Sequence, residues 1–482
     1  MSLYKTVLSF AAAALTLGST LAHAQGIALL RDAEIELFLD DHSRPIFAAA
    51  GLSPESIQIL VINDGRFNAF AGGRYMGVNT GFLTTVDTPA QMEAVIAHEA
   101  GHLAGGHSAR SDAMLASATR PMLLSLVLAA GAIAAGAPDA GFGILSLGQT
   151  IGMANLLRYS RGQESAADQA GVSYLDRLGH TSKGALEVWG KMRNSQIIRG
   201  SEINPYAQTH PLANDRLSAL RRRVEASPYL DVEDSPEEIE RLLFVQAKIR
   251  GFLHDPNAAL RYYPLTDQSE PAHYGRAVAY FRQSKMDLAL AEIDTLTTAH
   301  PDNPFFHELK GQLLFEYGRA SDAVAPYQRS IKLLPDNALM RINLGRALLA
   351  TNEPSQIEEA VTELNRALLL EADNSFGWFE LARAHSALGD DVMANLATAE
   401  SRFHAGAKPE ADQFARRAMS GLRRGTPEWR QAADIILASQ PDEGGAPLPS
   451  GVDEDGPPPR KPTEGERKKQ DVPDPGTGDQ PS

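Results

Sequence analysis

Apolar and polar positions follow two different periods along the chain. Residues 56–62 (SIQILVI) and 74–79 (RYMGVN) are short and rich in β-branched, aromatic and other apolar residues, which predicts two strands, the second of them next to Gly72-Gly73. Apolar residues then recur at helical spacing after Thr88-Pro89-Ala90-Gln91, a capping box with proline at the first helical position. Gly105-Gly106 provides a stop. We therefore expect strands followed by a helix with a defined start and end.

From about residue 236 to 425 the pattern is helical and repetitive. One series of small residues recurs at spacings of 34, 34 and 37, at Ala277, Gly311, Gly345 and Ala382. A second series recurs at spacings of 34, 37 and 34, at Ala289, Ala323, Ala360 and Ala394. Pro301-Asp302-Asn303 returns as Pro335-Asp336-Asn337 and as Ala372-Asp373-Asn374. This period is typical of tetratricopeptide repeats, whose paired helices approach closely at small residues. We expect three to four repeats plus a capping helix, with three extra residues in the turn near Asn352-Glu353-Pro354.

Two uncharged segments, 121–137 and 141–157, interrupt the first part of the chain. As a helix the first would be about 26 Å long, and a membrane span needs about 20 residues. Three interpretations stay open: buried core helices, a hairpin that docks on a membrane surface, and a transmembrane hairpin. Polar residues within the second segment disfavour the last, because they are costly in lipid.

The ends of the chain have compositions of their own. Residues 1–24 combine Lys5, an apolar stretch and Ala22-His23-Ala24, which predicts a secretory signal cleaved before Gln25. Residues 441–482 are rich in proline, glycine and charge, which predicts a disordered tail.

The net charge of −15 argues against nucleic-acid binding. The chain has no cysteine, so any metal ligands must come from His, Asp and Glu.

The predicted helix contains His98-Glu99-Ala100-Gly101-His102, an H-E-x-x-H pentad. Histidines four residues apart share a helix face and can bind one metal ion, and the adjacent glutamate can take a proton from its water. The residues leave two candidates for a third ligand. Glu164 shares a helix face with Asp168, which could accept the outer N–H of a ligand histidine. His107 is the other, although a metzincin pattern would require histidine at Ser108.

These motifs together resemble one peptidase family. The family is that of the CAAX-prenyl proteases, HtpX and the Oma-type mitochondrial proteases. Three segments carry the resemblance: Ala97 to His102, then Arg161-Gly162-Gln163-Glu164 with Asp168, then Thr209-His210-Pro211 with Arg216. Asn68-Ala69-Phe70-Ala71 also matches the segment that precedes the pentad there.

The resemblance implies a role for each matching residue. His98, His102 and Glu164 would bind one Zn²⁺, Glu99 would be the catalytic carboxylate, and Asp168 would support a ligand histidine. Two further candidates are His210 and Arg216. His210 would either stabilise the oxyanion or occupy the open position of zinc, and Arg216 would assist the oxyanion.

The expected fold is mainly α. A signal peptide (1–24) precedes a zinc-metallopeptidase domain with a small β-sheet (25–225) that carries the apolar hairpin at 121–157. An α-solenoid of tetratricopeptide repeats (226–425) and the disordered tail (441–482) follow.

The resemblance extends to function, because exported family members with such repeats act in outer-membrane β-barrel assembly. It implies a periplasmic zinc metalloendopeptidase, peripheral to the outer membrane, that degrades misassembled β-barrel proteins and assists their assembly. The repeats would contact the assembly machinery. An extended substrate would pair with a sheet edge near Arg74–Asn79. The alternative is a repeat-based chaperone or adaptor with occasional proteolysis.

Overall fold

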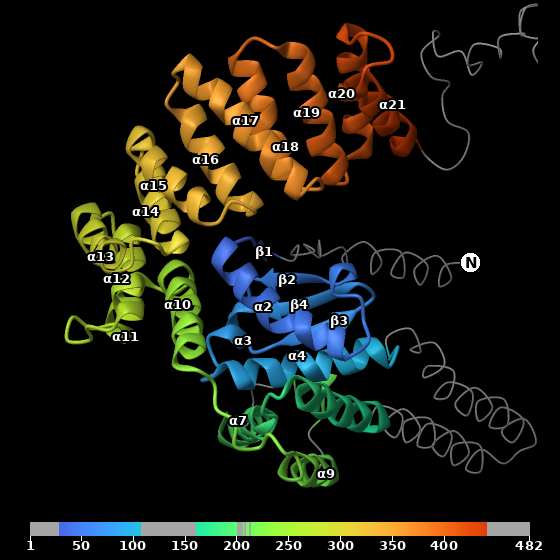
Figure 1. Cartoon of the computed structure of the whole chain (residues 1–482), viewed down its shortest axis with the longest axis vertical. Helices are drawn as coiled ribbons and strands as arrows, with labels where there is room; N and C mark the ends of the chain where they lie inside the picture. Colours follow the sequence, from blue (N-terminus) through green and yellow to red (C-terminus); the bar gives the residue numbers. More distant parts are fainter. Residues whose placement is uncertain (1–27, 108–160, 200–205, 207–208, 212–213, 441–482) are drawn as a thin grey trace, which may run out of the picture. The chain divides into compact units, whose positions relative to one another are not determined.

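The structure is a computed structural model that describes residues 28–107, 161–199, 206, 209–211 and 214–440 (Figure 1). The predicted signal peptide, the apolar hairpin at 121–157 and the tail lie outside the described residues. The chain divides into two compact units, residues 1–372 and 373–482. Within the described residues, no helix combines the length and the apolar character needed to cross a membrane.

A four-stranded sheet lies at the start of the first unit, in the order β1-β2-β4-β3. Both predicted strands are confirmed, as β2 (Gln58–Ile62) and β4 (Tyr75–Asn79), and they pair in parallel. β1 (Leu29–Leu30) pairs with β2, and β3 (Ala69–Gly72) pairs antiparallel with β4. β4 is therefore hydrogen-bonded on both sides, so the expected substrate edge near Arg74–Asn79 is wrong. Among the described residues, β1 and β3 are the outer strands.

Helices that contact this sheet directly, and helices that pack on those, carry most of the candidate residues (Figure 1). They are α2 (Ala33–Ala49), the 3₁₀ turn η1 (Pro54–Ser56), α3 (Thr80–Leu83), α4 (Pro89–Ala104), the helical residues 161–178, α7 (Lys183–Arg199) and α9 (Asn214–Glu225). α4 contacts α2, β3 and α7 and is almost wholly buried along its first three turns. It begins as predicted, because the Thr88 hydroxyl accepts from the N–H of Gln91 at 3.3 Å.

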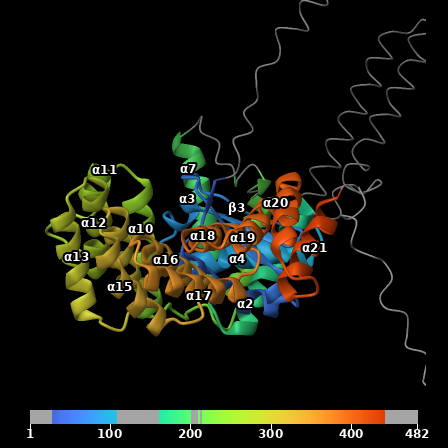
Figure 2. The same cartoon turned by 90° about the horizontal axis from the view of Figure 1, so that it is seen from above.

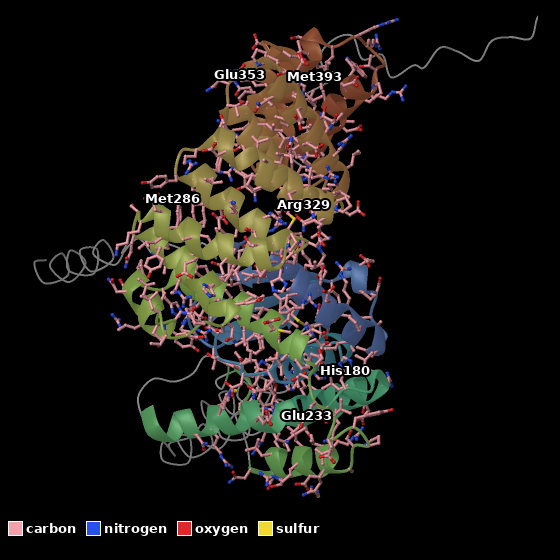
Figure 3. The ribbon with its side chains drawn as sticks, turned by 60° about the vertical axis from the view of Figure 1, so that its left-hand side comes forward. His180, Glu233, Met286, Arg329, Glu353 and Met393 are labelled. Carbon is pink, nitrogen blue, oxygen red and sulfur yellow. The ribbon has the colours of Figure 1, made fainter. Side chains whose placement is uncertain are left out.

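A buried carboxylate links three of these segments. Oε1 of Glu93, on α4, lies 2.7 Å from Nδ1 of His42 on α2. Its Oε2 lies 2.8 Å from Nδ1 of His180, which is labelled in Figure 3 and precedes α7. The helix that carries the pentad is thus tied to the segments on both sides of it.

Helical pairs make up the rest of the first unit. They are α10 (Pro236–Leu253), α11 (Pro256–Tyr262), α12 (Glu270–Arg282), α13 (Met286–Ala299), α14 (Pro304–Glu316), α15 (Ala320–Leu333), α16 (Ala338–Ala350) and α17 (Pro354–Leu370). α12 packs with α13, α14 with α15 and α16 with α17, whereas α10 packs mainly on α12. Figure 2 gives the view from above. The predicted repeat architecture is confirmed.

The periodic residues have identifiable structural roles. A Cβ added to Gly311 would lie 2.8 Å from the ring of Tyr327, and one added to Gly345 would lie 2.7 Å from Cγ of Leu364, so only glycine permits these helix approaches. The recurrent asparagine caps the first helix of a pair. The side chains of Asn303 and Asn337 accept from backbone N–H groups of α14 and α16.

The three extra residues of the repeat do not lie in a turn. α17 has 17 residues, whereas α13 and α15 have 14 each, and the turn before α17 spans residues 351–353 just as 317–319 precede α15. Pro354 stands at the first turn of α17, where its fixed φ suits a helix and its missing N–H costs nothing. The insertion therefore adds about one helical turn.

The second unit contains α18 (Ser375–Ala387), α19 (Asp391–His404), α20 (Lys408–Gly421) and α21 (Pro427–Ser439). Asn374 caps α18, as its counterparts cap α14 and α16. Alanines of α20 pack with α19 and α21 around Ile435 and Ile436. Helix α21 lies after residue 425, the end that the sequence analysis gave to the repeats.

Candidate metal centre

Helix α4 presents two histidines on one face. Nε2 of His98 and Nε2 of His102 lie 3.1 Å apart, because residues four apart on a helix stand one above the other. His98 is buried, and His102 is partly buried. Glu99 lies beside them and is only 1% exposed.

Two side chains from other segments complete the cluster. Oε1 of Glu164, on the helix 161–178, lies 3.3 Å from Nε2 of His102, and its Oε2 lies 3.4 Å from Nε2 of His98. Nδ1 of His210 lies 3.3 Å from Nε2 of His98 and 3.1 Å from Oε2 of Glu164. Tetrahedral zinc with bonds of about 2.0–2.1 Å separates its ligand atoms by about 3.3 Å. His98, His102, Glu164 and His210 thus fit one cation of that size.

Small residues at the helix crossing allow this convergence. A Cβ on Gly101 would lie 2.9 Å from the backbone of Ala167, and one on Gly171 would lie 3.1 Å from the backbone of Ala97. The backbones of α4 and the helix 161–178 therefore touch. This close approach brings Glu164 within reach of the two histidines.

The charges in the cluster favour a bound cation. Burial alone would lower the pKa of His98, but Asp168 and Glu164 raise it to about 9. Burial alone would raise the pKa of Glu164, but its contacts with His102, His210 and His98 bring it well below its usual value. The carboxylates thus hold positive charge at this point, as a metal site requires.

Asp168 and Arg216 lie behind the cluster. Oδ1 of Asp168 lies 3.0 Å from Nδ1 of His98, on the side of the ring away from Glu164. Nε and Nη2 of Arg216 donate to the carboxylate of Asp168 at 2.6 and 2.9 Å. Nη1 of Arg216 lies 2.8 Å from Oε2 of Glu164 and donates to the carbonyl of Pro211 at 3.1 Å. Burial would raise the pKa of Asp168, but Arg216 and His98 lower it below its usual value. The guanidinium thus holds both carboxylates in place.

Tyr206 is a site residue that the sequence analysis missed. Its hydroxyl donates to Oε1 of Glu99 at 3.0 Å, and its ring stacks on His210 with centroids 4.3 Å apart. The N–H of His210 donates to the carbonyl of Tyr206 at 2.8 Å, so one turn of chain carries both rings. An aromatic residue four positions before the histidine of the Thr209-His210-Pro211 motif was the available signal.

The structure brings together all of the predicted site residues, namely His98, Glu99, His102, Glu164, Asp168, His210 and Arg216. His107, the other candidate for third ligand, is not in the four-residue cluster. It lies on the opposite side of His102, with its Nδ1 2.8 Å from Nδ1 of that ring. Of the two candidates for third ligand that the sequence left open, Glu164 is the one that lies in the cluster.

Comparisons with known proteins agree with this geometry. Residues 33–224 match peptidase family M48, and residues 244–304 and 308–375 match the tetratricopeptide repeat. The chain is 25% identical over 409 residues to the beta-barrel assembly-enhancing protease of Escherichia coli K12, covering 83% of this chain and 81% of the relative. It is 24% identical over 385 residues to the Yersinia pestis protein of the same name, covering 77% and 76%.

A more distant similarity concerns the repeats. Over 134 residues the chain is 30% identical to the human tetratricopeptide repeat protein 13, covering 26% of this chain and 15% of that protein. Tetratricopeptide repeats are protein-interaction modules with extended concave surfaces. With the family match, the protease-named relatives and the four-residue cluster, residues 33–224 form a metallopeptidase domain of the peptidase M48 type, and tetratricopeptide repeats follow it in the chain.

Proposed function

We propose that the chain is a zinc-dependent endopeptidase, exported to the periplasm, that degrades misassembled outer-membrane β-barrel proteins and assists their assembly. The observation that carries the peptidase role is the convergence of His98, His102 and Glu164 beside the buried carboxylate of Glu99. The names of the E. coli and Y. pestis relatives support the substrate class. The signal-like residues 1–24 support export.

The chemistry assigned to each group follows from its position. When bound by His98, His102 and Glu164, zinc supplies Lewis acidity, which polarises the scissile carbonyl and makes a water molecule acidic near neutral pH. Glu99 takes a proton from the attacking water and delivers it to the leaving amine. Arg216 contacts Glu164 and Asp168, so we propose that it holds these carboxylates and does not meet the oxyanion.

His210 supports a closed resting form. Its Nδ1 lies among the ligand atoms, and its Nε2 lies 3.5 Å from Oε1 of Glu99. A substrate carbonyl would need the position that His210 fills. Of the two roles considered for His210, occupation of the open zinc position fits these distances better than oxyanion stabilisation. The segment that carries Tyr206 and His210 must then move before catalysis.

We propose β3, an outer strand of the sheet in the described part of the chain, as the place where substrate docks. β3 is an edge strand that contacts α4, and Phe70 on it is 40% exposed. An extended peptide could add to this edge through main-chain hydrogen bonds, which are independent of side-chain identity. Selectivity would then depend on how unfolded the substrate is and on what the repeats recruit. We propose that the repeats contact the β-barrel assembly machinery.

The alternative function is a repeat-based chaperone or adaptor with occasional proteolysis. The position of His210 favours it to the extent that the site stays closed. The two functions differ in their dependence on Glu99. A chaperone would keep most of its cellular function in a Glu99→Gln variant, and a peptidase would not.

The first experiment compares residues 25–482 with the Glu99→Gln variant on an unfolded outer-membrane β-barrel protein, with zinc content measured in both. Binding of about one zinc by both, with cleavage only by the unmutated protein, supports the proposal. If neither cleaves, His210→Ala decides between the functions. If that variant cleaves the substrate, the result supports a peptidase with a closed resting form. If it also fails to cleave, the result favours the chaperone.

A further inference from the structure

His107 contacts the outer nitrogen of a ligand histidine. Its Nδ1 lies 2.8 Å from Nδ1 of His102, and the two rings meet edge to face with centroids 4.9 Å apart. The other nitrogen of His102, Nε2, points toward His98 and Glu164. His102 therefore lies between His107 and the other residues of the cluster.

The direction of this hydrogen bond follows from the chemistry of imidazole. A neutral imidazole has one N–H donor and one lone-pair acceptor. If Nε2 of His102 offers its lone pair to a metal, its Nδ1 carries the proton and donates. Nδ1 of His107 must then be the acceptor.

The end of α4 explains how His107 reaches this position. Gly106 has a φ of +60°, in the left-handed region that glycine adopts without strain. The chain therefore folds back, and the N–H of His107 donates to the carbonyl of His102 at 3.1 Å. Gly105 leaves room for the returning ring, because a Cβ there would lie 2.5 Å from Nε2 of His107. The pair Gly105-Gly106 thus ends the helix and also lets the ring of His107 return to His102.

The two ligand histidines have different outer partners. Nδ1 of His98 faces the buried carboxylate of Asp168 at 3.0 Å, and that carboxylate is itself held by Arg216. His102 faces an imidazole instead. Groups behind metal-ligating histidines fix the tautomer and orientation of the ring, and their loss typically weakens metal binding by about 10–100-fold.

We propose that His107 is a positioning residue of the metal centre: it accepts a hydrogen bond from Nδ1–H of His102 and so keeps Nε2 of His102 directed at the metal. This inference rests on the proposed zinc site. It assigns His107 a role that differs from that of a ligand.

The test measures zinc affinity by competition with a chelator, in residues 25–482 carrying Glu99→Gln to prevent self-cleavage. His107→Ala should weaken zinc binding about 10–100-fold. His107→Asn should restore most of the affinity, because its amide oxygen can accept at about the position of Nδ1. Gly105→Ala, which drives the ring away, should weaken binding as His107→Ala does. His254→Ala, at an exposed histidine of the repeats, is the matched control and should change nothing.

Each outcome bears on the inference separately from the proposed function. Equal zinc affinity in His107→Ala and the parent overturns the positioning role and leaves the zinc site standing. Equal weakening in His107→Ala and His107→Asn also overturns it, because packing and not the hydrogen bond would then be responsible. A parent protein that binds no zinc overturns both. Thermal unfolding of the metal-free variants checks that the fold is retained.

Discussion

The hydroxyl of Tyr206 donates a hydrogen bond to Oε1 of Glu99 at 3.0 Å, and both side chains are buried. This bond ties the turn that carries His210 to the proposed catalytic carboxylate. A buried carboxylate needs such donors, because desolvation penalises its charge. The same contact thus supports Glu99 and keeps the ligand cluster covered by His210.

Replacing Tyr206 by phenylalanine should destabilise the fold. The change removes the donor and leaves the rest of the ring in place, so the free energy of unfolding should fall by about 1.5–3 kcal/mol, the usual contribution of a hydrogen bond to a charged group. Urea denaturation of the metal-free protein measures the difference. Tyr317→Phe is the control, because that tyrosine is 49% exposed. Equal unfolding midpoints for the Tyr206 variant and the parent would contradict the assigned contact.

Removing the charge of Arg216 should cost more. Arg216 is buried between Asp168 and Glu164, so Arg216→Met leaves two buried carboxylates without their partner. We expect a loss of about 3–5 kcal/mol in the free energy of unfolding, measured by denaturant titration. Arg216→Lys should recover only part of this, because an ammonium cannot bind both carboxylates as the planar guanidinium does. A Met variant as stable as the parent would rule out the bridging role.

Asp168→Asn should act mainly on the metal. The substitution keeps the shape of the side chain and removes the charge that faces Nδ1 of His98. Zinc affinity should fall about 10–100-fold. Chelator competition provides the measurement. The matched control is Asp176→Asn, because Asp176 lies on the same helix as Asp168 but pairs with Arg223 of α9. Unchanged zinc affinity in Asp168→Asn, or an equal loss in Asp176→Asn, would show that Asp168 does not support His98.

The cluster of His180, Glu93 and His42 predicts a pH dependence of stability. The hydrogen bond with Glu93 raises the pKa of His180, partly offset by burial, and Asp234 and Glu238 raise it further. Burial would raise the pKa of Glu93, but His180 and His42 lower it below its usual value. The contribution of His180 to the free energy of unfolding is fully present below its unfolded-state pKa of 6.5. It is lost as the pH rises through the raised pKa of the folded state. The Glu93 contribution is present above 4.5 and is lost as the pH falls through the lowered value.

His180→Gln should therefore cost more stability at pH 6 than at pH 9. The side chain of His180 is 43% exposed, so solvent screening keeps the effect below about 1 kcal/mol. Thermal unfolding at both pH values measures the difference. An exposed histidine of the repeats for which no carboxylate contact is found among the described residues, replaced in His254→Gln, corrects for general effects of pH. A cost that is the same at both pH values would contradict the ion pair.

Gly345→Ala should destabilise the repeats. The added Cβ would lie 2.7 Å from Cγ of Leu364, and overpacking of this kind costs about 1–3 kcal/mol. Gly190→Ala is the matched control, since a Cβ on that helical glycine of α7 meets nothing within 4 Å. The control should be neutral or gain up to about 1 kcal/mol, because alanine is the better helix former. Thermal unfolding of both variants tests the comparison, and equal effects would refute the close helix approach.

Local patterns in the chain were sufficient for several parts of this structure. The helix with His98 and His102 followed from its cap, its apolar spacing and its glycine stop, since these signals act within a few residues. The repeats followed from the 34-residue recurrence of small residues, each of which meets a partner helix in the same way. The resemblance carried by Glu164, Asp168 and His210 then led to the remaining members of the site.

Tertiary packing decided what local sequence could not. β4 pairs on both sides and β3 is an outer strand of the described sheet, which the sequence did not predict because strand order depends on contacts between distant segments. The contact of Tyr206 with Glu99 joins residues far apart in the sequence, and the contact of His107 with His102 depends on how the chain folds back after α4. The sequence by itself determined which residues could bind a metal. Only the packing of α4 against the helix 161–178, backbone to backbone at Gly101, decided which of them meet at one point, since a ligand set is defined by a convergence of a few ångströms.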